Sequence, residues 1–188
     1  MIIKKIQEHF KLFPVSSRDQ LLKRFYEGDL KAVRKLNDKL RKLVDRKVLE
    51  VNREIKPYVY FSTPRCIHLR SNHLKHHLSV VDFYLWMTVD QGKEVEVVAL
   101  EHPLGRNLPR PDLIIKWKGI KHHVELQRTI ITDSQMNKKI KGYEDALIQG
   151  KIKSDEIIWI VSPRTYNITS PYLQVVQTNT IQNKVPLT

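Results

Sequence analysis

Arg110–Arg128 reads RPDLIIKWKGIKHHVELQR, and this stretch decides the fold of the second half of the chain. Lys118-Gly119 predicts a two-residue hairpin turn, because glycine accepts a positive φ and apolar residues alternate on both sides of the pair. Such a turn places Asp112 opposite Glu125. One face of the hairpin is then apolar, and the other is mostly polar and carries Asp112, Ile114, Lys116, Lys121, His123, Glu125 and Gln127.

Asp112 and Glu125 would be like charges about 5 Å apart, an arrangement that weakens a hairpin unless a positive group lies between them. A Mg²⁺ or Mn²⁺ ion with oxygen ligands is one such group, so the pair predicts a metal site. Neutralisation by Arg110, Lys116 or Lys121 is the alternative, because strands with one wet face often carry Asp and Glu.

The segments around the hairpin alternate between helical and strand-like patterns. The predicted elements are a helix at 74–89, a strand at 94–101, the hairpin, a helix from Asp133 or Ser134 that buries Met136, Ile140, Tyr143 and Leu147, a strand at 156–161 and a candidate edge strand at 172–176. The order is therefore helix, three strands, helix, strand.

This order resembles the core of the PD-(D/E)xK nuclease superfamily, whose motif would be Pro111-Asp112 and Glu125-Leu126-Gln127. The chain also resembles the replication-relaxation family of plasmids and other mobile elements. That resemblance rests on a winged-helix-like N-terminus followed by His76-His77-Leu78, Arg110-Pro111-Asp112 and Val124-Glu125. It implies an α+β protein in which a winged helix-turn-helix domain precedes a PD-(D/E)xK-like αβββαβ core.

The resemblance also implies roles for the site residues. Asp112 and Glu125 would hold Mg²⁺ or Mn²⁺, and the products would be a 5′-phosphate and a 3′-hydroxyl. Gln127 stands where the superfamily has lysine, so it can orient a water molecule but adds no positive charge. Lys121 on the same strand face, or Lys139 on the following helix, is a candidate source of that charge.

Four further residues have a functional and a structural interpretation. Glu101 is a third metal ligand or an exposed carboxylate at a strand end, and Asp82 is a helix acid of the superfamily or a surface residue. His77 matches the histidine at the head of the family's helix, and His123 could bond a phosphate or a water. Zinc is not expected, because His73 and His77 lack a third ligand.

The N-terminal third is strongly basic. Residues 1–65 hold 17 Lys and Arg against 8 Asp and Glu, whereas residues 66–188 hold 16 against 12. The predicted elements are three helices, at 3–13, from Ser17 to Tyr26 and from Asp29, followed by strands at 48–51 and 58–61. The third helix is expected to bury one stripe of side chains: Leu30, Val33, Leu36, Leu40 and Leu43. Three helices and a β-ribbon resemble a winged helix-turn-helix domain, in which the third helix enters the major groove.

Double-stranded DNA is the expected partner of this domain, since the chain carries a net charge of +13. The candidate contacts are Arg34, Lys35 and Lys39 on the third helix and Arg53 and Lys56 in the wing. A solvated basic helix on a protein-binding winged helix is the alternative.

Composition adds four expectations. The charge shift favours two domains, at 1–65 and 66–188. No apolar run has membrane-spanning length, and the N-terminus lacks the layout of a secretion signal. A lone Cys66 excludes an internal disulfide and fits the cytoplasm.

Two functions follow from these patterns. The first is a metal-dependent endonuclease or nickase of a plasmid or mobile element. The second is an inactive DNA-binding accessory protein or transcriptional regulator that uses the nuclease fold as a scaffold. A second copy of the chain and proteins of replication or transfer are further candidate partners.

Overall fold

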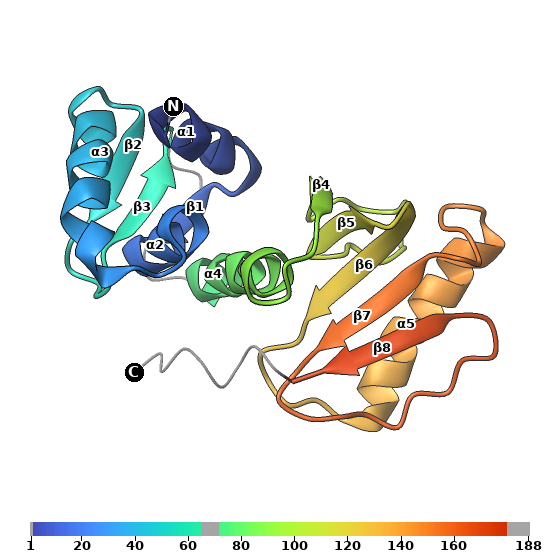
Figure 1. The fold of residues 1–188 in the computed structure, drawn as a ribbon. Coiled ribbons are helices and arrows are strands. Elements are labelled where there is room, and N and C mark those ends of the chain that lie inside the picture. The colour runs from blue at the N-terminus through green and yellow to red at the C-terminus, as the bar shows by residue number, and fades with distance from the viewer. Residues whose placement is uncertain (1, 65–71, 180–188) are drawn as a thin grey trace. The chain divides into compact units, whose positions relative to one another are not determined.

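A computed structural model describes residues 2–64 and 72–179, and the chain divides into two units, Met1–Lys93 and Glu94–Thr188 (Figure 1). This division differs from the boundary expected near Arg65, because helix α4 (Asn72–Leu85) packs against α2 and β1 of the first unit. Cys66 lies outside the described residues. None of the described helices is long and apolar enough to cross a membrane.

The first unit has three short strands and four α-helices among its described residues. Its elements are α1 (Ile2–Leu12), β1 (Val15–Ser17), α2 (Arg18–Tyr26), the 3₁₀ turn η1 (Leu30–Ala32), α3 (Val33–Asp45), β2 (Leu49–Asn52), β3 (Val59–Ser62), α4 (Asn72–Leu85) and the π-helical turn η2 (Trp86–Asp90). The strands form an antiparallel sheet in the order β1-β3-β2. The sequence predicted the helices, β2 and β3, but not β1.

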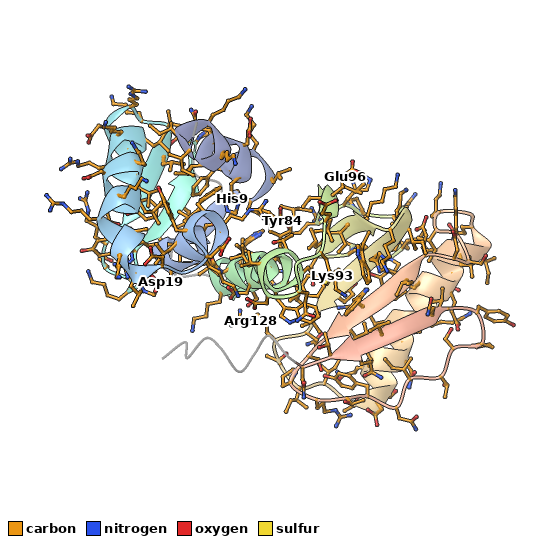
Figure 2. All side chains as sticks on the ribbon, viewed as in Figure 1. His9, Asp19, Tyr84, Lys93, Glu96 and Arg128 are labelled. Carbon is orange, nitrogen blue, oxygen red and sulfur yellow. The ribbon has the colours of Figure 1, made fainter. Side chains whose placement is uncertain are left out.

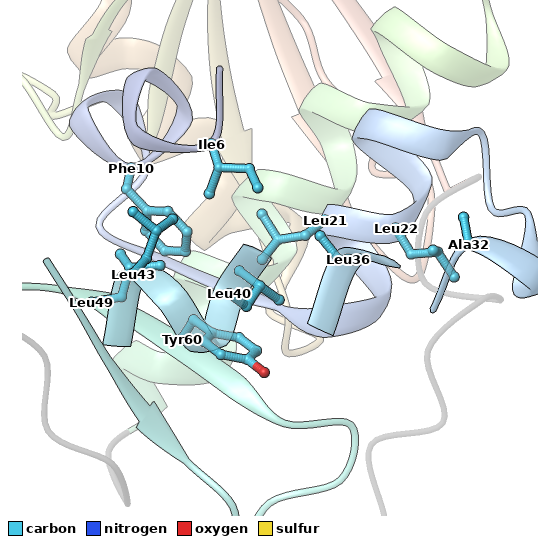
Figure 3. Close-up of a cluster of buried hydrophobic side chains, with 10 residues drawn as sticks. All are labelled: Ile6, Phe10, Leu21, Leu22, Ala32, Leu36, Leu40, Leu43, Leu49 and Tyr60. Atoms are coloured by element: carbon cyan, nitrogen blue, oxygen red, sulfur yellow. The ribbon is translucent and has the colours of Figure 1, made fainter. Parts of the chain in front are cut away.

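The core of this unit lies between the helices and the sheet. Ten buried residues form one cluster, shown in Figure 3: Ile6, Phe10, Leu21, Leu22, Ala32, Leu36, Leu40, Leu43, Leu49 and Tyr60. The predicted stripe of α3 is confirmed for Leu36, Leu40 and Leu43. Leu30 is 78% exposed and its predicted burial was wrong, because it belongs to η1 and is out of phase with the helix.

Polar contacts fix the helix positions in this unit. Ser17 and Gln20 form a capping box at the start of α2, where the sequence predicted a helix to begin. His9, labelled in Figure 2, is buried in α1, and its Nε2 lies 2.7 Å from Ser16 Oγ in β1. The guanidinium of Arg24 lies 4.8 Å from the ring centroid of Tyr84, so α2 and α4 are joined by a cation–π contact.

Among residues 94–179, the second unit is a five-stranded sheet with one helix. Its elements are β4 (Val95–Leu100), β5 (Leu113–Trp117), β6 (Ile120–Leu126), α5 (Asp133–Ile148), β7 (Ile157–Val161) and β8 (Gln174–Thr178). The strand order is β4-β5-β6-β7-β8; β4, β5 and β6 are antiparallel, whereas β7 and β8 run parallel to β6. The candidate edge strand at 172–176 is found as β8.

The hairpin of β5 and β6 has the predicted register. Leu113 pairs with Val124 and Trp117 with Ile120. The turn residues Lys118 and Gly119 have φ values of 51° and 84°, as a two-residue turn of type I′ requires.

Helix α5 covers one face of the sheet, where Met136, Ile140 and Tyr143 pack near Ile158 and Ile160 of β7. This is the face that the sequence marked as mostly polar. The part around His123 and Glu125 is buried instead of wet, since each is 2% exposed, whereas Lys116 and Lys121 near the turn are exposed. A charge on Glu125 must therefore be paired inside the protein.

Candidate active site

Asp112 is held at the entrance of β5 by two bonds to β6. Its N–H donates to the carbonyl of Val124 at 3.0 Å, and its Oδ2 accepts from the N–H of Leu126 at 2.7 Å. The hairpin register, continued by one residue, sets it opposite Glu125. The two carboxylates that the sequence placed across from each other are thus neighbours on adjacent strands.

Glu125 receives two contacts from α5. The hydroxyl of Tyr143 donates to Oε1 at 2.6 Å, and the ammonium of Lys139 pairs with Oε2. Lys139 and Tyr143 are four residues apart, a spacing that brings both side chains to one face of a helix. One buried carboxylate therefore has a separate partner for each oxygen.

The electrostatics of Glu125 are dominated by its burial. Burial raises the pKa of its carboxyl group, and the charge of Asp112 raises it further, while Lys139 and Tyr143 oppose the shift. Burial and the nearby Glu125 also raise the pKa of Tyr143 well above its usual value. Tyr143 consequently remains a hydrogen-bond donor at neutral pH.

Gln127 lies at the end of β6, where the motif has lysine. Its N–H donates to the carbonyl of Val161 at 2.8 Å. Its side-chain amide donates to the carbonyl and the hydroxyl of Thr129 at 3.0 and 3.1 Å. These bonds direct the amide toward the segment that leads into α5.

Lys139, and not Lys121, contacts the carboxylates. Lys121 pairs with Lys116 beside the turn and is exposed. It lies four residues from Glu125 along β6, or about 13 Å at the usual rise of a strand. Of the two lysines that the sequence offered as a source of positive charge, only the helical one is in place.

His123 lies on the same face as Glu125, but it contacts a different acid, Glu156. Its Nε2 is 2.6 Å from Oε2 of Glu156, and both side chains are buried. Burial lowers the pKa of His123, although Glu156 opposes the shift. Sequence reasoning missed Glu156, whose signal was its place as the one acidic residue, at the start, of the otherwise apolar stretch EIIWIV.

Glu101 follows β4 with a φ of 43°, in the left-handed region. Its N–H donates to the carbonyl of Asp112 at 3.2 Å, and its own carbonyl accepts from Arg110 Nε. Across residues 2–64 and 72–179, no group of three or more His, Cys, Asp and Glu side chains is arranged to hold a metal ion. A metal role for Glu101 stays a prediction.

Asp82 and His77 both lie in α4 of the first unit. Asp82 accepts a 2.7 Å bond from Nε2 of Gln20 in α2, and burial raises its pKa to about 6. This contact is structural, since it joins α2 to α4. His77 is half-buried, with its ring centroid 6.0 Å from that of His76.

The basic residues predicted for the third helix and the wing are mostly at the surface. Arg34 and Lys35 of α3 are exposed, whereas Lys39 is half-buried. Arg53 and Lys56, between β2 and β3, are exposed as well. The Nζ of Lys56 lies 3.7 Å from the ring centroid of Tyr58, a cation–π contact that orders this segment.

Comparison with known protein families relates part of the chain to a described family. The family described as competence protein CoiA, nuclease-like domain, matches residues 73–184, which begin in α4 and include all of β4 to β8. The match supports the nuclease-like domain but not the replication-relaxation family. No curated protein matches the chain. More than half of the chain is covered, and the chain belongs to the family of the CoiA nuclease-like domain.

Proposed function

We propose that this protein is a metal-dependent DNA nuclease in which Asp112 and Glu125 hold the metal ion. The observation that carries the proposal is the opposed pair of carboxylates with the ammonium of Lys139 on Glu125. A nuclease site needs acidic oxygens for a cation and a fixed positive charge beside them. Both are present on adjacent elements of the family's nuclease-like domain.

The donor set suits Mg²⁺ or Mn²⁺, since both prefer oxygen, and Mg²⁺ is commonly bound through one or two carboxylates and substrate phosphates. A bound ion would lower the pKa of a water molecule and offset charge on the phosphate. Glu125 Oε2 is shared with Lys139, so this ammonium must move aside or share the oxygen when a cation binds.

Lys139 takes the place of the missing strand lysine in this proposal. The side chain of Lys139 is one-third exposed, so its ammonium can serve both Glu125 and a phosphate at the edge of the sheet. Gln127 is close by on β6 and can orient a water molecule through its amide. Tyr143 holds Glu125 in position from the other side.

The first unit is proposed to bind DNA as a winged helix-turn-helix domain. The element order α1, β1, α2, α3, β2, β3 and the antiparallel sheet support this, with α3 as the recognition helix. Its exposed Arg34 and Lys35, with Arg53 and Lys56 in the wing, supply the positive charge that phosphate contact requires.

The biological setting is also a proposal. The matched family is named for competence, so DNA taken up by the cell is a candidate substrate. A role in plasmid replication or transfer, with replication proteins or a second copy of the chain as partners, is the narrower hypothesis from the sequence.

A second candidate function is an inactive DNA-binding scaffold. Gln127 at the lysine position favours it, as do the two side chains that already occupy the oxygens of Glu125. In this case the ion pair of Glu125 and Lys139 would only stabilise the fold, which many nuclease-like domains retain without activity.

The deciding experiment is cleavage of supercoiled plasmid with Mg²⁺ or Mn²⁺. Asp112→Asn, Glu125→Gln and Lys139→Met are each expected to slow cutting about 100-fold or more, because each removes a charge from the reacting centre. Lys138→Met is the matched control, since Lys138 is exposed on the same helix. Binding without metal-dependent cutting would favour the scaffold.

A further inference from the structure

A groove in the first unit lies between α3 and the β2–β3 hairpin. It has a volume of about 190 Å³ and is lined chiefly by Arg41, Val44, Val51, Arg53, Tyr58 and Tyr60. This is below the roughly 300–1,000 Å³ of sites for drug-sized ligands, so it holds one ring system at most. All of these residues come from a continuous part of the described chain, between Arg41 and Tyr60.

The groove has an apolar floor. Tyr60 is 6% exposed and belongs to the same hydrophobic cluster as Leu40 and Leu43, next to which it is drawn in Figure 3. Val44 and Val51 are half-buried against that cluster. A flat apolar group can therefore lie here without unpaired polar atoms beneath it.

The rim of the groove is positively charged. Arg41 and Arg53 are both exposed. Arg41 has one acidic neighbour, Asp38, at 3.4 Å, and the two side chains are 70% and 51% exposed. Such a pair is worth about 0–1 kcal/mol, so it leaves Arg41 free to bind another anion.

Tyr58 supplies an aromatic wall beside the cations. Lys56 lies 3.7 Å from its ring centroid, and a hydrogen bond from Lys56 lowers the pKa of the Tyr58 hydroxyl. Aromatic rings and arginine planes are the groups on which unpaired bases stack. Asn37 and Asp38 add an amide and a carboxylate at the mouth, which can bond to the edge of a base.

We infer that this groove binds one unpaired nucleotide of a DNA strand, with its base against Tyr58 and the apolar floor and its phosphate on Arg41 and Arg53. The inference rests on the DNA binding proposed above and narrows the substrate to DNA with a single-stranded end or an unpaired base. A base inside a duplex is stacked on both sides and cannot enter. A duplex would use only the outer cations of α3, such as Arg34.

The test compares two fluorescent DNAs by anisotropy, with the full chain and EDTA to prevent cutting. One is a blunt duplex, and the other is the same duplex with a single-stranded overhang. Wild type is expected to bind the overhang about 5- to 100-fold more tightly, as base stacking usually contributes. Tyr58→Ala and Arg41→Ala should lose this preference, whereas Tyr58→Phe, which keeps the ring, should retain it.

Arg34→Ala is the matched control, because Arg34 is an exposed arginine of α3 outside the groove. This substitution is expected to weaken the binding of both DNAs by the same factor. Far-UV circular dichroism checks that each variant folds. Equal binding of the two DNAs by wild type would overturn the inference, as would groove variants that behave like Arg34→Ala.

Two other outcomes separate this inference from its alternatives. If the protein prefers the overhang DNA but does not cut plasmid, the result supports nucleotide binding in the groove and contradicts the nuclease proposal. If it cuts plasmid but binds both DNAs equally, the result contradicts only nucleotide binding in the groove. An acidic tyrosine-containing peptide that displaces the overhang, and whose binding Tyr58→Ala abolishes, would reassign the groove to a protein partner.

Discussion

Replacing Lys139 by methionine tests the electrostatics of the candidate site directly. Methionine keeps most of the length and apolar stem of lysine but leaves Glu125 without its ion-pair partner. Breaking a fully buried pair usually costs about 3–5 kcal/mol. The side chain of Glu125 is 3% exposed but that of Lys139 is 34% exposed, so the expected loss is smaller, about 2–3 kcal/mol at pH 8.

The loss should depend on pH with a definite sign. Burial already raises the pKa of Glu125, and removal of Lys139 takes away the main influence that opposes the shift. A carboxyl group whose pKa is raised by folding binds more protons in the folded state than in the unfolded state. The free energy of unfolding therefore falls as the pH rises above the pKa of the unfolded glutamate, which is about 4.3. The variant should therefore approach wild-type stability at pH 4.5 and show its full deficit at pH 8.

The assay is urea unfolding followed by tryptophan fluorescence in a Trp86→Phe background. Trp117 and Trp159 then report on the second unit alone, since Trp86 belongs to the first. The control is Lys139→Met in a Glu125→Gln background, where no buried charge remains and the expected cost is under about 1 kcal/mol. The reasoning is refuted if the loss is the same at pH 4.5 and pH 8, or the same in both backgrounds.

Three further predictions concern single contacts. Tyr143→Phe should lose about 1–3 kcal/mol in urea unfolding at pH 8, because Glu125 Oε1 loses its donor while the ring stays packed. Asp82→Asn should stabilise the first unit at pH 8 by about 1–3 kcal/mol and give a clearly smaller gain at pH 4.5, because burial raises the pKa of Asp82 to about 6 and the neutral amide can still accept from Gln20; a loss at pH 8 would contradict this. Ser17→Ala should lower the stability of the first unit by about 1 kcal/mol, measured by thermal unfolding, with Ser17→Asp retaining most of it as a capping residue.

The hairpin could be predicted from the sequence because its information is local. Lys118-Gly119 sets the turn, and alternation on both sides then sets which residues pair. The same holds for the capping box at Ser17, where the residues that bond are three apart in the chain. Where the interacting residues lie within one turn or one hairpin, the pattern of residue types is enough to predict the structure.

The features that could not be predicted from the sequence depend on contacts between residues that are far apart in the chain. The hairpin face expected to be exposed is buried at His123 and Glu125, because α5, which connects β6 to β7 in the chain, packs on that face of the sheet. Strand β1 has only three residues, too few for a periodic signal, and is defined by pairing with β3. Helix α4 looks like the start of the nuclease core by order, yet its contacts with α2 and β1 place it in the first unit.

The candidate site depends both on local sequence patterns and on packing between distant residues. A catalytic and a purely structural role of the site therefore predict different effects of replacing Lys139. The carboxylates come from a hairpin that the sequence specifies, whereas the cation comes from a helix whose register decides whether Lys139 or another lysine reaches Glu125. If the site is catalytic, Lys139 must serve two partners, the buried Glu125 and a phosphate, and its replacement should remove cutting at pH 8 under conditions in which the variant is still folded. If the site is only structural, the same replacement should affect stability alone, with a deficit that disappears as Glu125 takes up a proton.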